Sequence, residues 1–137
     1  MILMDTGPLV ALFDPKDADH RHCHEILAQI SEPLYTSEAV LTEVFHMLDP
    51  ASRGAEGVKE FLLQDFVSHV PLDKTLLQRC FELMDKYEDL PMDFADASLL
   101  VLAEKFKTTK VFTLDFEDFR IYKIKKGHRL YPLQLLA

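Results

Sequence analysis

The sequence predicts an α/β protein with a central, mostly parallel sheet of four or five strands and helices on both faces. Short apolar segments alternate with longer amphipathic ones, which is typical of a parallel sheet whose strands are joined by helices. The chain has only 4 glycines, too few for the many tight turns of an all-β fold. No repeat or Gly/Ser linker divides the chain, so we expect one domain over residues 1–137.

The first third of the chain begins with a strand and two helices. Residues 2–5, "ILMD", form an apolar run of the kind found in strands that are buried on both faces. Residues 7–13, "GPLVALF", predict a short helix, with Pro8 tolerated near its start. The apolar residues of the next helix have helical spacing and are Cys23, Ile26, Leu27 and Ile30. Pro33 ends that helix.

The middle of the chain continues the alternation. Residues 33–36, "PLYT", predict a second strand, after which Ser37 is a suitable N-cap for the helix "EAVLTEVFHML". A further helix is expected over about residues 55–64. Residues 65–72, "DFVSHVPL", predict the third strand, and Asp73 caps the helix "KTLLQRCFELMDKY".

The last third supplies one long helix and the remaining strands. Asp93 precedes residues 94–107, "FADASLLVLAEKFK", whose apolar positions predict a helix packed over much of its surface. Residues 110–115, "KVFTLD", predict a fourth strand, and residues 128–133, "HRLYPL", are the candidate fifth.

Charge is unevenly distributed along the chain. Residues 1–104 hold 7 Lys and Arg against 20 Asp and Glu, whereas residues 105–137 hold 8 against 3. The acidic majority argues against tight non-specific binding of duplex DNA, because that affinity comes from neutralising phosphates. The strip "RIYKIKKGHR", residues 120–129, is either a local phosphate-binding surface or a solvated tail.

The sequence favours a cytoplasmic, reduced protein with no membrane partner. The start "MILMD" lacks the basic leader and long apolar run of a signal peptide. No apolar stretch reaches the roughly 18 residues of a membrane span. Cys23 and Cys80 both lie in helix-like segments and give no disulfide framework.

Four acidic residues are expected to meet at one edge of the sheet. In an open parallel sheet, ligands bind outside the carboxyl ends of the strands, where the strand order reverses. Asp5 ends the first strand and Asp115 the fourth, so both project toward that edge if the two strands are neighbours. Asp96 lies in the first turn of a helix that begins there, and Glu43 lies on the apolar face of its own helix.

Such a cluster of carboxylates needs a compensating cation. Each like-charge pair at ~4 Å costs about 4 kcal/mol at an effective dielectric constant near 20. The carboxyl groups would therefore titrate as a coupled set with raised pKa values. A divalent cation removes the conflict, and a set of oxygen ligands suits Mg²⁺ or Mn²⁺ better than zinc.

Each acid also has a purely structural interpretation. Asp93 is most simply a helix cap, with Asp96 as the second member of a capping box. Asp115 is placed to cap "FEDF", and Glu43 could be a surface acid on an amphipathic helix. Asp5 is the hardest to explain structurally, because buried strand ends seldom carry unpaired acids.

Two other segments resemble parts of different catalytic or metal sites. The sequence Asp-Thr-Gly at residues 5–7 also occurs in retroviral-type aspartic proteases, but their all-β fold is incompatible with the helical segments that occupy most of this chain. In "DHRHCHE", His20, Cys23 and His24 share a helical face that could bind zinc. No second Cys/His pair stands at zinc-ligand spacing, so solvated histidines are the preferred interpretation.

Four segments together resemble the PIN domain, the nuclease domain of the toxins in VapBC-type toxin–antitoxin pairs. They are "ILMDTGPLVAL", "TSEAVLTEVFHML", "MDFADASLLVLAEK" and "KVFTLDFEDF", which occur in the family's order and spacing and span nearly the whole chain. The resemblance implies an α/β/α fold and a metal-dependent endoribonuclease that cleaves single-stranded RNA and leaves a 5′-phosphate.

The resemblance also implies roles for individual residues. The family's four acids correspond to Asp5, Glu43, Asp96 and Asp115. Asp5 and Asp96 are then expected to bind one or two Mg²⁺ or Mn²⁺ ions directly. Glu43 and Asp115 would help to orient a second ion or the attacking water.

Three further residues belong to the predicted site. Thr6 and Thr113 match positions that carry hydroxyl groups in the family, and are expected to hydrogen-bond the metal ligands or the substrate. Asp93 is an addition to the family pattern, and either joins the site or only caps its helix. The implied partners are an RNA substrate, an antitoxin protein and a second copy of the chain. The alternative function is a PIN-like module that binds RNA or protein without cleaving.

Overall fold

The computed structural model describes all residues from Met1 to Ala137. Its centre is a five-stranded sheet in the order β3-β2-β1-β4-β7, and every neighbouring pair is parallel. The strands are β1 (Ile2–Met4), β2 (Leu34–Ser37), β3 (Val67–Val70), β4 (Lys110–Phe112) and β7 (Gln134–Leu136). The predicted α/β class with a parallel sheet is confirmed.

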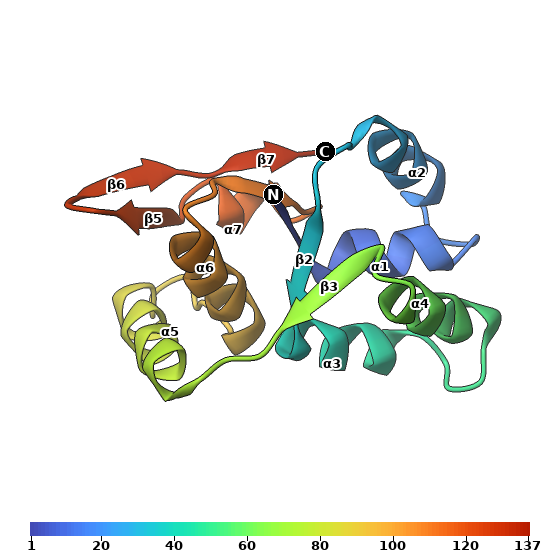
Figure 1. Ribbon diagram of the computed structural model, residues 1–137, viewed down its shortest axis with the longest axis horizontal. Coiled ribbons are helices and arrows are strands. Elements are labelled where there is room, and N and C mark those ends of the chain that lie inside the picture. The colour runs from blue at the N-terminus through green and yellow to red at the C-terminus, as the bar shows by residue number, and fades with distance from the viewer.

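Helices cover both faces of this sheet. They are α1 (Thr6–Phe13), α2 (His20–Gln29), α3 (Glu38–Met47), α4 (Arg53–Leu63), α5 (Lys74–Lys86), α6 (Phe94–Phe106) and α7 (Phe116–Phe119). Figure 1 shows α5 and α6 on one side of the sheet and α1, α2 and α4 on the other. None of these helices combines the length and apolar character needed to cross a lipid bilayer.

The core is built from the central strand and the central helix. All three residues of β1 are buried, because helices cover both faces of the sheet at this strand. In α6, eight residues between Ala95 and Ala103 are buried, as expected for a helix that is apolar on nearly all sides. Helix α6 contacts β1 and β2 on one side and α5 on another, so its first turn has a fixed position beside the sheet.

A buried serine pair joins the second strand to this helix. Ser37 Oγ accepts a hydrogen bond from Val40 N (3.1 Å) and so caps α3, as predicted. Ser98 Oγ donates to Ala95 O (2.6 Å), so the 2.6 Å contact between the two hydroxyls leaves Ser37 as its donor. Helices α3 and α6 therefore begin at positions fixed relative to each other.

The predicted fifth strand exists but belongs to a different sheet. Within residues 128–133, only Arg129–Pro132 are extended, forming β6, which pairs in antiparallel fashion with β5 (Lys123–Lys126) in a separate two-stranded sheet. The fifth strand of the main sheet is instead β7, which follows β6 and lies beside β4. The physical reason is that Gly127, with φ of 64°, allows a tight turn between β5 and β6. Strand β6 therefore pairs with its neighbour in the chain and not with the main sheet.

Candidate metal centre

The carboxyl ends of β1 and β4 meet at the point where strand order reverses. Strand β1 lies in the middle of the sheet, with β2 and β3 on one side and β4 and β7 on the other. The two strands are direct parallel neighbours, as the predicted convergence of Asp5 and Asp115 requires. Asp5 follows β1 directly, and Thr113 follows β4 directly. This edge is where an open parallel sheet binds ligands.

Asp5 is a buried carboxylate held by two neighbours. Its side chain is only 7% exposed, and Oδ2 accepts a 2.7 Å hydrogen bond from the Thr113 hydroxyl. Burial raises the pKa of Asp5 to about 6, and repulsion from Glu43 and Asp115 adds to the rise. The Thr113 hydroxyl and the Thr6 backbone N–H oppose the rise, because they stabilise the charged form.

Glu43 is brought to the same edge by α3. Thr6, the first residue of α1, donates from Oγ1 to Glu43 Oε1 at 2.6 Å. This bond ties the helix that follows β1 to the helix that follows β2. Glu43 adds to the electrostatic repulsion that Asp5 experiences. The two predicted threonines thus contact two of the predicted acids directly.

Asp96 lies in the first turn of α6, as predicted, and is half-buried. Burial, followed by repulsion from Asp93 and Asp5, raises the pKa of Asp96 to about 8. Its Oδ2 accepts a 3.0 Å hydrogen bond from the Tyr122 hydroxyl, which favours the charged form but does not offset those effects. Burial and the nearby Asp96 carboxylate also raise the pKa of Tyr122, so this tyrosine remains a donor.

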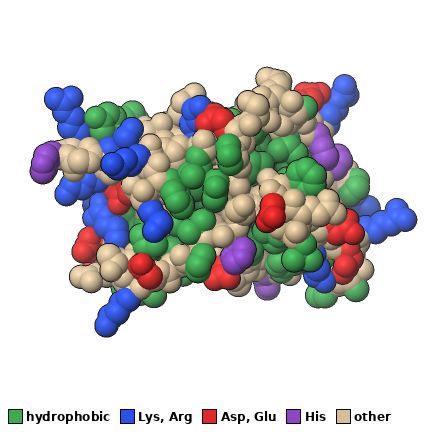
Figure 2. All heavy atoms as spheres, in the orientation of Figure 1, with side chains coloured by type: hydrophobic (Ala, Val, Ile, Leu, Met, Phe, Trp, Pro, Cys, Tyr) green, Lys and Arg blue, Asp and Glu red, His purple; other side chains and the backbone are tan.

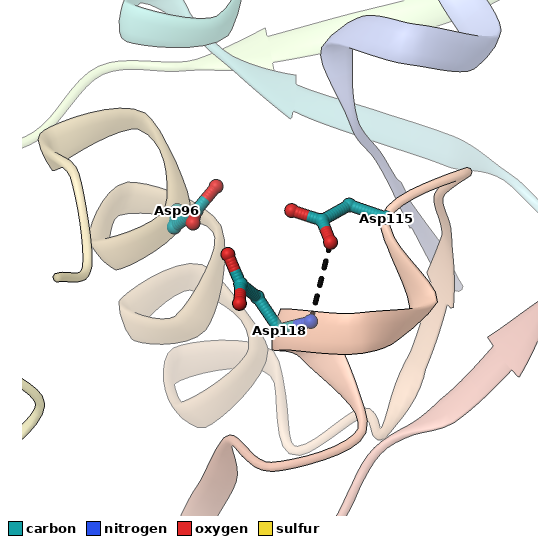
Figure 3. Close-up of side chains that lie close together, drawn as sticks. All are labelled: Asp96, Asp115 and Asp118. Atoms are coloured by element: carbon teal, nitrogen blue, oxygen red, sulfur yellow. Dashed lines mark hydrogen bonds between the residues drawn. The ribbon is translucent and has the colours of Figure 1, made fainter. Parts of the chain in front are cut away.

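Asp115 points toward Asp96 from the opposite side, together with a third aspartate. Figure 3 shows the side chains of Asp96, Asp115 and Asp118 converging, the first from α6 and the others from the start of α7. One carboxylate oxygen from each lies within 4.8 Å of the others. Asp115 also caps α7, since its Oδ1 accepts from Asp118 N at 3.2 Å, and its own N–H donates to Thr113 Oγ1 at 3.0 Å.

Asp93 caps α6. Its Oδ1 accepts a 2.8 Å hydrogen bond from Asp96 N, and its side chain is exposed. It therefore positions the first turn of the helix that carries Asp96, and its charge raises the pKa of that aspartate. Asp93 is not one of the three aspartates whose carboxylate oxygens converge.

The donor chemistry of the site fits a divalent cation. All of the converging ligands are carboxylate oxygens, and an ion with metal–oxygen distances of about 2.0–2.6 Å can bridge such separations. None of the chain's ion pairs includes Asp5, Glu43, Asp96, Asp115 or Asp118, so no Lys or Arg neutralises them. Mg²⁺ or Mn²⁺ matches this oxygen-only set.

Two residues of the site were missed in the sequence. Asp118 stands three residues after Asp115, a spacing that places both side chains on one face of a helical turn, so the sequence did carry a signal for it. Burial and the nearby Asp115 raise the pKa of Asp118. Tyr122 had no comparable signal, because its contact with Asp96 depends on how the chain after α7 folds back along α6.

The histidine-rich segment does not form a zinc site. His20 Nδ1 donates to Ala11 O at 2.6 Å and His24 Nε2 donates to Leu12 O at 3.0 Å. His24 is exposed and His20 partly exposed, in line with the expected solvated histidines, and the two bonds also attach α2 to the end of α1. Cys23 between them is buried in the core.

The chain is similar to known proteins over most of its length. A family model described as the PIN domain matches residues 2–125. Ribonuclease VapC26 of Mycobacterium tuberculosis (strain ATCC 25618 / H37Rv) is 25% identical over 132 residues, which is 93% of this chain and 96% of that protein. These matches include the strand, helices and loop that carry the acids.

Solved structures share the fold. The M. tuberculosis VapC20 structure, described as a sarcin-ricin loop cleaving toxin, is similar with a TM-score of 0.77 and 21% identity, covering 85% of this chain and 92% of that chain. A toxin–antitoxin complex from Klebsiella pneumoniae is similar with a TM-score of 0.66 and 18% identity, covering 87% of this chain and 90% of that chain. VapBC2 from Rickettsia felis, bound to a promoter DNA fragment, is similar with a TM-score of 0.64 and 16% identity, covering 99% of this chain and 98% of that chain. At these identities the likeness establishes the fold alone.

Proposed function

The chain belongs to the PIN domain family, and we propose that it is a divalent-metal-dependent endoribonuclease. It hydrolyses phosphodiester bonds of single-stranded RNA and leaves a 5′-phosphate, with residues 1–137 acting as one nuclease domain. The observation that carries this proposal is the set of uncompensated carboxylates at the carboxyl ends of β1 and β4. The similarity to a ribonuclease over 93% of the chain supports the reaction class.

Mg²⁺ or Mn²⁺ is the proposed cofactor. Asp5 and Asp96 are the proposed direct ligands, with Asp115 and Asp118 completing the set around Asp96. A divalent ion in such a site supplies positive charge to the attacking and leaving oxygens of an in-line displacement. Bound positive charge also favours the ionised form of Asp96, whose pKa is otherwise raised to about 8.

The remaining residues orient and hold these groups. Thr113 donates to Asp5 and accepts from the Asp115 backbone, so one hydroxyl sets the distance between two acids. Thr6 occupies Oε1 of Glu43 and leaves Oε2 without a hydrogen bond from the protein. We propose that this oxygen orients the attacking water and accepts its proton, the role of a general base.

The biological setting is also proposed. We infer that the chain is the toxin of a toxin–antitoxin pair, with an antitoxin protein as partner and a homodimer as its assembly. The similarity to chains from toxin–antitoxin complexes supports this inference. Expression of the chain alone should slow growth of a bacterial host, and co-expression of a small neighbouring reading frame should restore it. Growth that is unaffected by the chain alone would argue against the toxin role.

Cleavage of a pool of single-stranded RNA tests the enzymatic proposal. The wild type should cleave with Mg²⁺ or Mn²⁺ and lose activity in EDTA, and the products should be substrates for a 5′-phosphate-dependent exonuclease. Asp96→Asn should be inactive, whereas Asp89→Asn, which changes an exposed acid outside the cluster, should retain full activity. Equal cleavage by wild type and Asp96→Asn would indicate a contaminant, and binding without cleavage would favour the non-catalytic alternative.

A further inference from the structure

The basic strip near the end of the chain forms a hairpin rather than a tail. We call residues 120–132, which contain β5 and β6, the basic hairpin. The segment from residue 119 to residue 137 has no Asp or Glu. Its cations all lie in the basic hairpin and are Arg120, Lys123, Lys125, Lys126 and Arg129. The most positive segment of an otherwise acidic chain therefore has a defined structure.

The basic hairpin is fixed to α6 at both ends of that helix. Tyr122, directly before β5, donates to Asp96 in the first turn of α6. Lys125 N donates to Glu104 Oε2 near the last turn of α6 at 2.7 Å, and the Ile124 side chain between these two contacts is fully buried. Strand β5 thus runs along α6, starting at the acid site and leading away from it.

The cations of the basic hairpin are free of ion pairs and can bind an external anion. Lys123 and Lys125 are exposed and lie two residues apart on the same face of β5, about 6.6 Å from each other along the strand. None of the five cations forms an ion pair. Figure 2 shows Lys and Arg side chains gathered at the end of the molecule where Figure 1 places β5 and β6.

The acid site needs such a surface if it acts on RNA. The substrate is a polyanion, and the cluster of Asp96, Asp115 and Asp118 repels it except where a cation intervenes. Most of the remaining chain is also acidic, because residues 1–104 hold 20 Asp and Glu against 7 Lys and Arg. A single strand is usually held by a positive surface that follows its backbone. The basic hairpin is a positive surface that starts at the acid site.

We propose that the basic hairpin is the RNA-binding arm of this enzyme, with Lys123 and Lys125 contacting successive phosphates of the strand that leads away from the acid site. This inference rests on the proposed ribonuclease function and adds the substrate contacts. An acidic protein segment is the other polyanion that would fit five cations. RNA is favoured because Tyr122 attaches the arm to Asp96, so a strand lying on β5 is directed into the acid cluster.

The test compares two double variants that remove equal charge. Lys123→Gln/Lys125→Gln removes two of the five cations of the arm, and Lys16→Gln/Arg53→Gln removes two exposed cations in the loop after α1 and at the start of α4. Figure 1 shows α1 and α4 on the other side of the sheet from α6. Binding of a short fluorescein-labelled single-stranded RNA of mixed sequence is measured by anisotropy in EDTA, over a series of KCl concentrations. Equal melting temperatures establish that both variants are folded.

The arm variant should bind RNA less tightly and with a weaker salt dependence. Loss of two phosphate contacts makes the negative slope of log K against log [KCl] less steep by about 1.4, which is about 25-fold in affinity at 0.1 M. The control variant should match the wild type, and Lys123→Arg/Lys125→Arg should retain both affinity and slope. Equal affinity and slope for the arm and control variants would overturn the proposal.

Two further outcomes separate this inference from its premise. If a labelled oligoglutamate of equal charge binds the wild type more tightly than the RNA does, the arm is a protein-docking surface and the proposal fails. If RNA binding depends on the arm but the wild type does not cleave with Mn²⁺, the RNA-binding arm stands and the ribonuclease proposal falls. If the wild type cleaves while the arm variant keeps its affinity and slope, only the arm proposal falls.

Discussion

At the scale of single residues, the acids that define the site oppose folding of the metal-free protein. Asp5 and Asp96 have pKa values raised to about 6 and about 8 from an ordinary value of 3.8. Between the unfolded and folded pKa values, the folded protein binds more protons than the unfolded chain, so stability falls as pH rises. Below about pH 4 both states are protonated and these groups exert no such penalty.

The free energy of unfolding of the metal-free protein should therefore decrease from pH 5 to pH 8. The whole shift of Asp5 corresponds to about 3 kcal/mol, at roughly 1.4 kcal/mol per pKa unit, and about 1.4 kcal/mol of it is lost above pH 5. Urea denaturation in EDTA at several pH values measures this dependence. A stability that stays constant or increases over this interval would show that the two carboxyl groups are not protonated as the structure implies.

Replacing Asp5 with asparagine should stabilise the metal-free protein while removing its response to metal. Asp5→Asn keeps an oxygen for the Thr113 hydroxyl but removes a buried charge that Glu43 and Asp115 repel. At pH 8 its melting temperature in EDTA should exceed that of the wild type. Mn²⁺ at 100 times its Kd should stabilise the wild type by about 2.7 kcal/mol.

Asp89→Asn, an exposed site, provides the matched control for this experiment. It should resemble the wild type both in EDTA and in Mn²⁺. A melting temperature that rises equally with Mn²⁺ in Asp5→Asn and in the wild type would count against Asp5 as a ligand.

Removing the Thr113 hydroxyl should destabilise the protein, and more so at pH 8 than at pH 5. Thr113→Val removes the hydroxyl that donates to Asp5 Oδ2 and leaves the Asp115 N–H without its acceptor, which costs about 1–3 kcal/mol for buried groups. The loss is larger at pH 8, where Asp5 is ionised and needs the donor more. Urea denaturation of Thr113→Val and Thr113→Ser measures the effect, and Thr113→Ser should remain close to wild type. Similar losses in both variants would assign the effect to packing.

At the scale of elements, the buried serine pair fixes the positions of α3 and α6 relative to each other. Ser37→Ala removes the cap of α3 and the donor to Ser98, in a position with no access to water, and should cost about 2 kcal/mol. Ser52→Ala removes a comparable cap from α4, away from the acids, and should cost about 1 kcal/mol.

Denaturation and RNA cleavage together distinguish the two serine variants. Both should lose stability, but only Ser37→Ala should also lose cleavage activity, because α3 carries Glu43 and α6 carries Asp96. Unchanged cleavage in a destabilised Ser37→Ala would show that the two helices hold the acids without this link.

The main sheet was predictable from sequence up to its fourth strand, because each of these four segments is a short run with apolar residues followed by a helix signal. The last strands were not. The apolar residues Ile124, Leu130 and Tyr131 suit a strand of the main sheet and a separate hairpin equally well. The choice depends on tertiary contacts, namely the bond from Gln134 N to Thr109 O for β7 and the bond from Lys125 N to Glu104 for β5.

The site was predictable to the extent that it follows strand ends and helix starts. Asp5, Asp96 and Asp115 are placed by local structure, so their shared edge follows from the sequence if β1 and β4 are neighbours, as they are. Asp118 was predictable from its spacing three residues after Asp115. Tyr122 was not, since a hydroxyl that reaches across from a later segment leaves no periodic signal.

At the scale of the whole molecule, the charge asymmetry of the chain becomes an arrangement in space. The acids gather at the carboxyl edge of the sheet, and the basic hairpin leads away from that edge along α6. Repulsion inside the acid cluster favours binding of a cation, and the basic hairpin favours binding of a polyanion. These are the two features that the proposed metal-dependent ribonuclease requires, a site for the cation and a surface for the RNA.

The rate of single-stranded RNA cleavage as a function of Mn²⁺ concentration tests this central claim most directly, with wild type and Asp5→Asn purified side by side. The wild-type rate should rise from zero in EDTA and saturate with Mn²⁺. Asp5→Asn should be slower at every Mn²⁺ concentration, by at least about 100-fold, since loss of even an outer partner of a metal ligand costs 10–100-fold. Cleavage that persists in EDTA, or equal rates for the two proteins, would contradict a metal-dependent ribonuclease built on these acids.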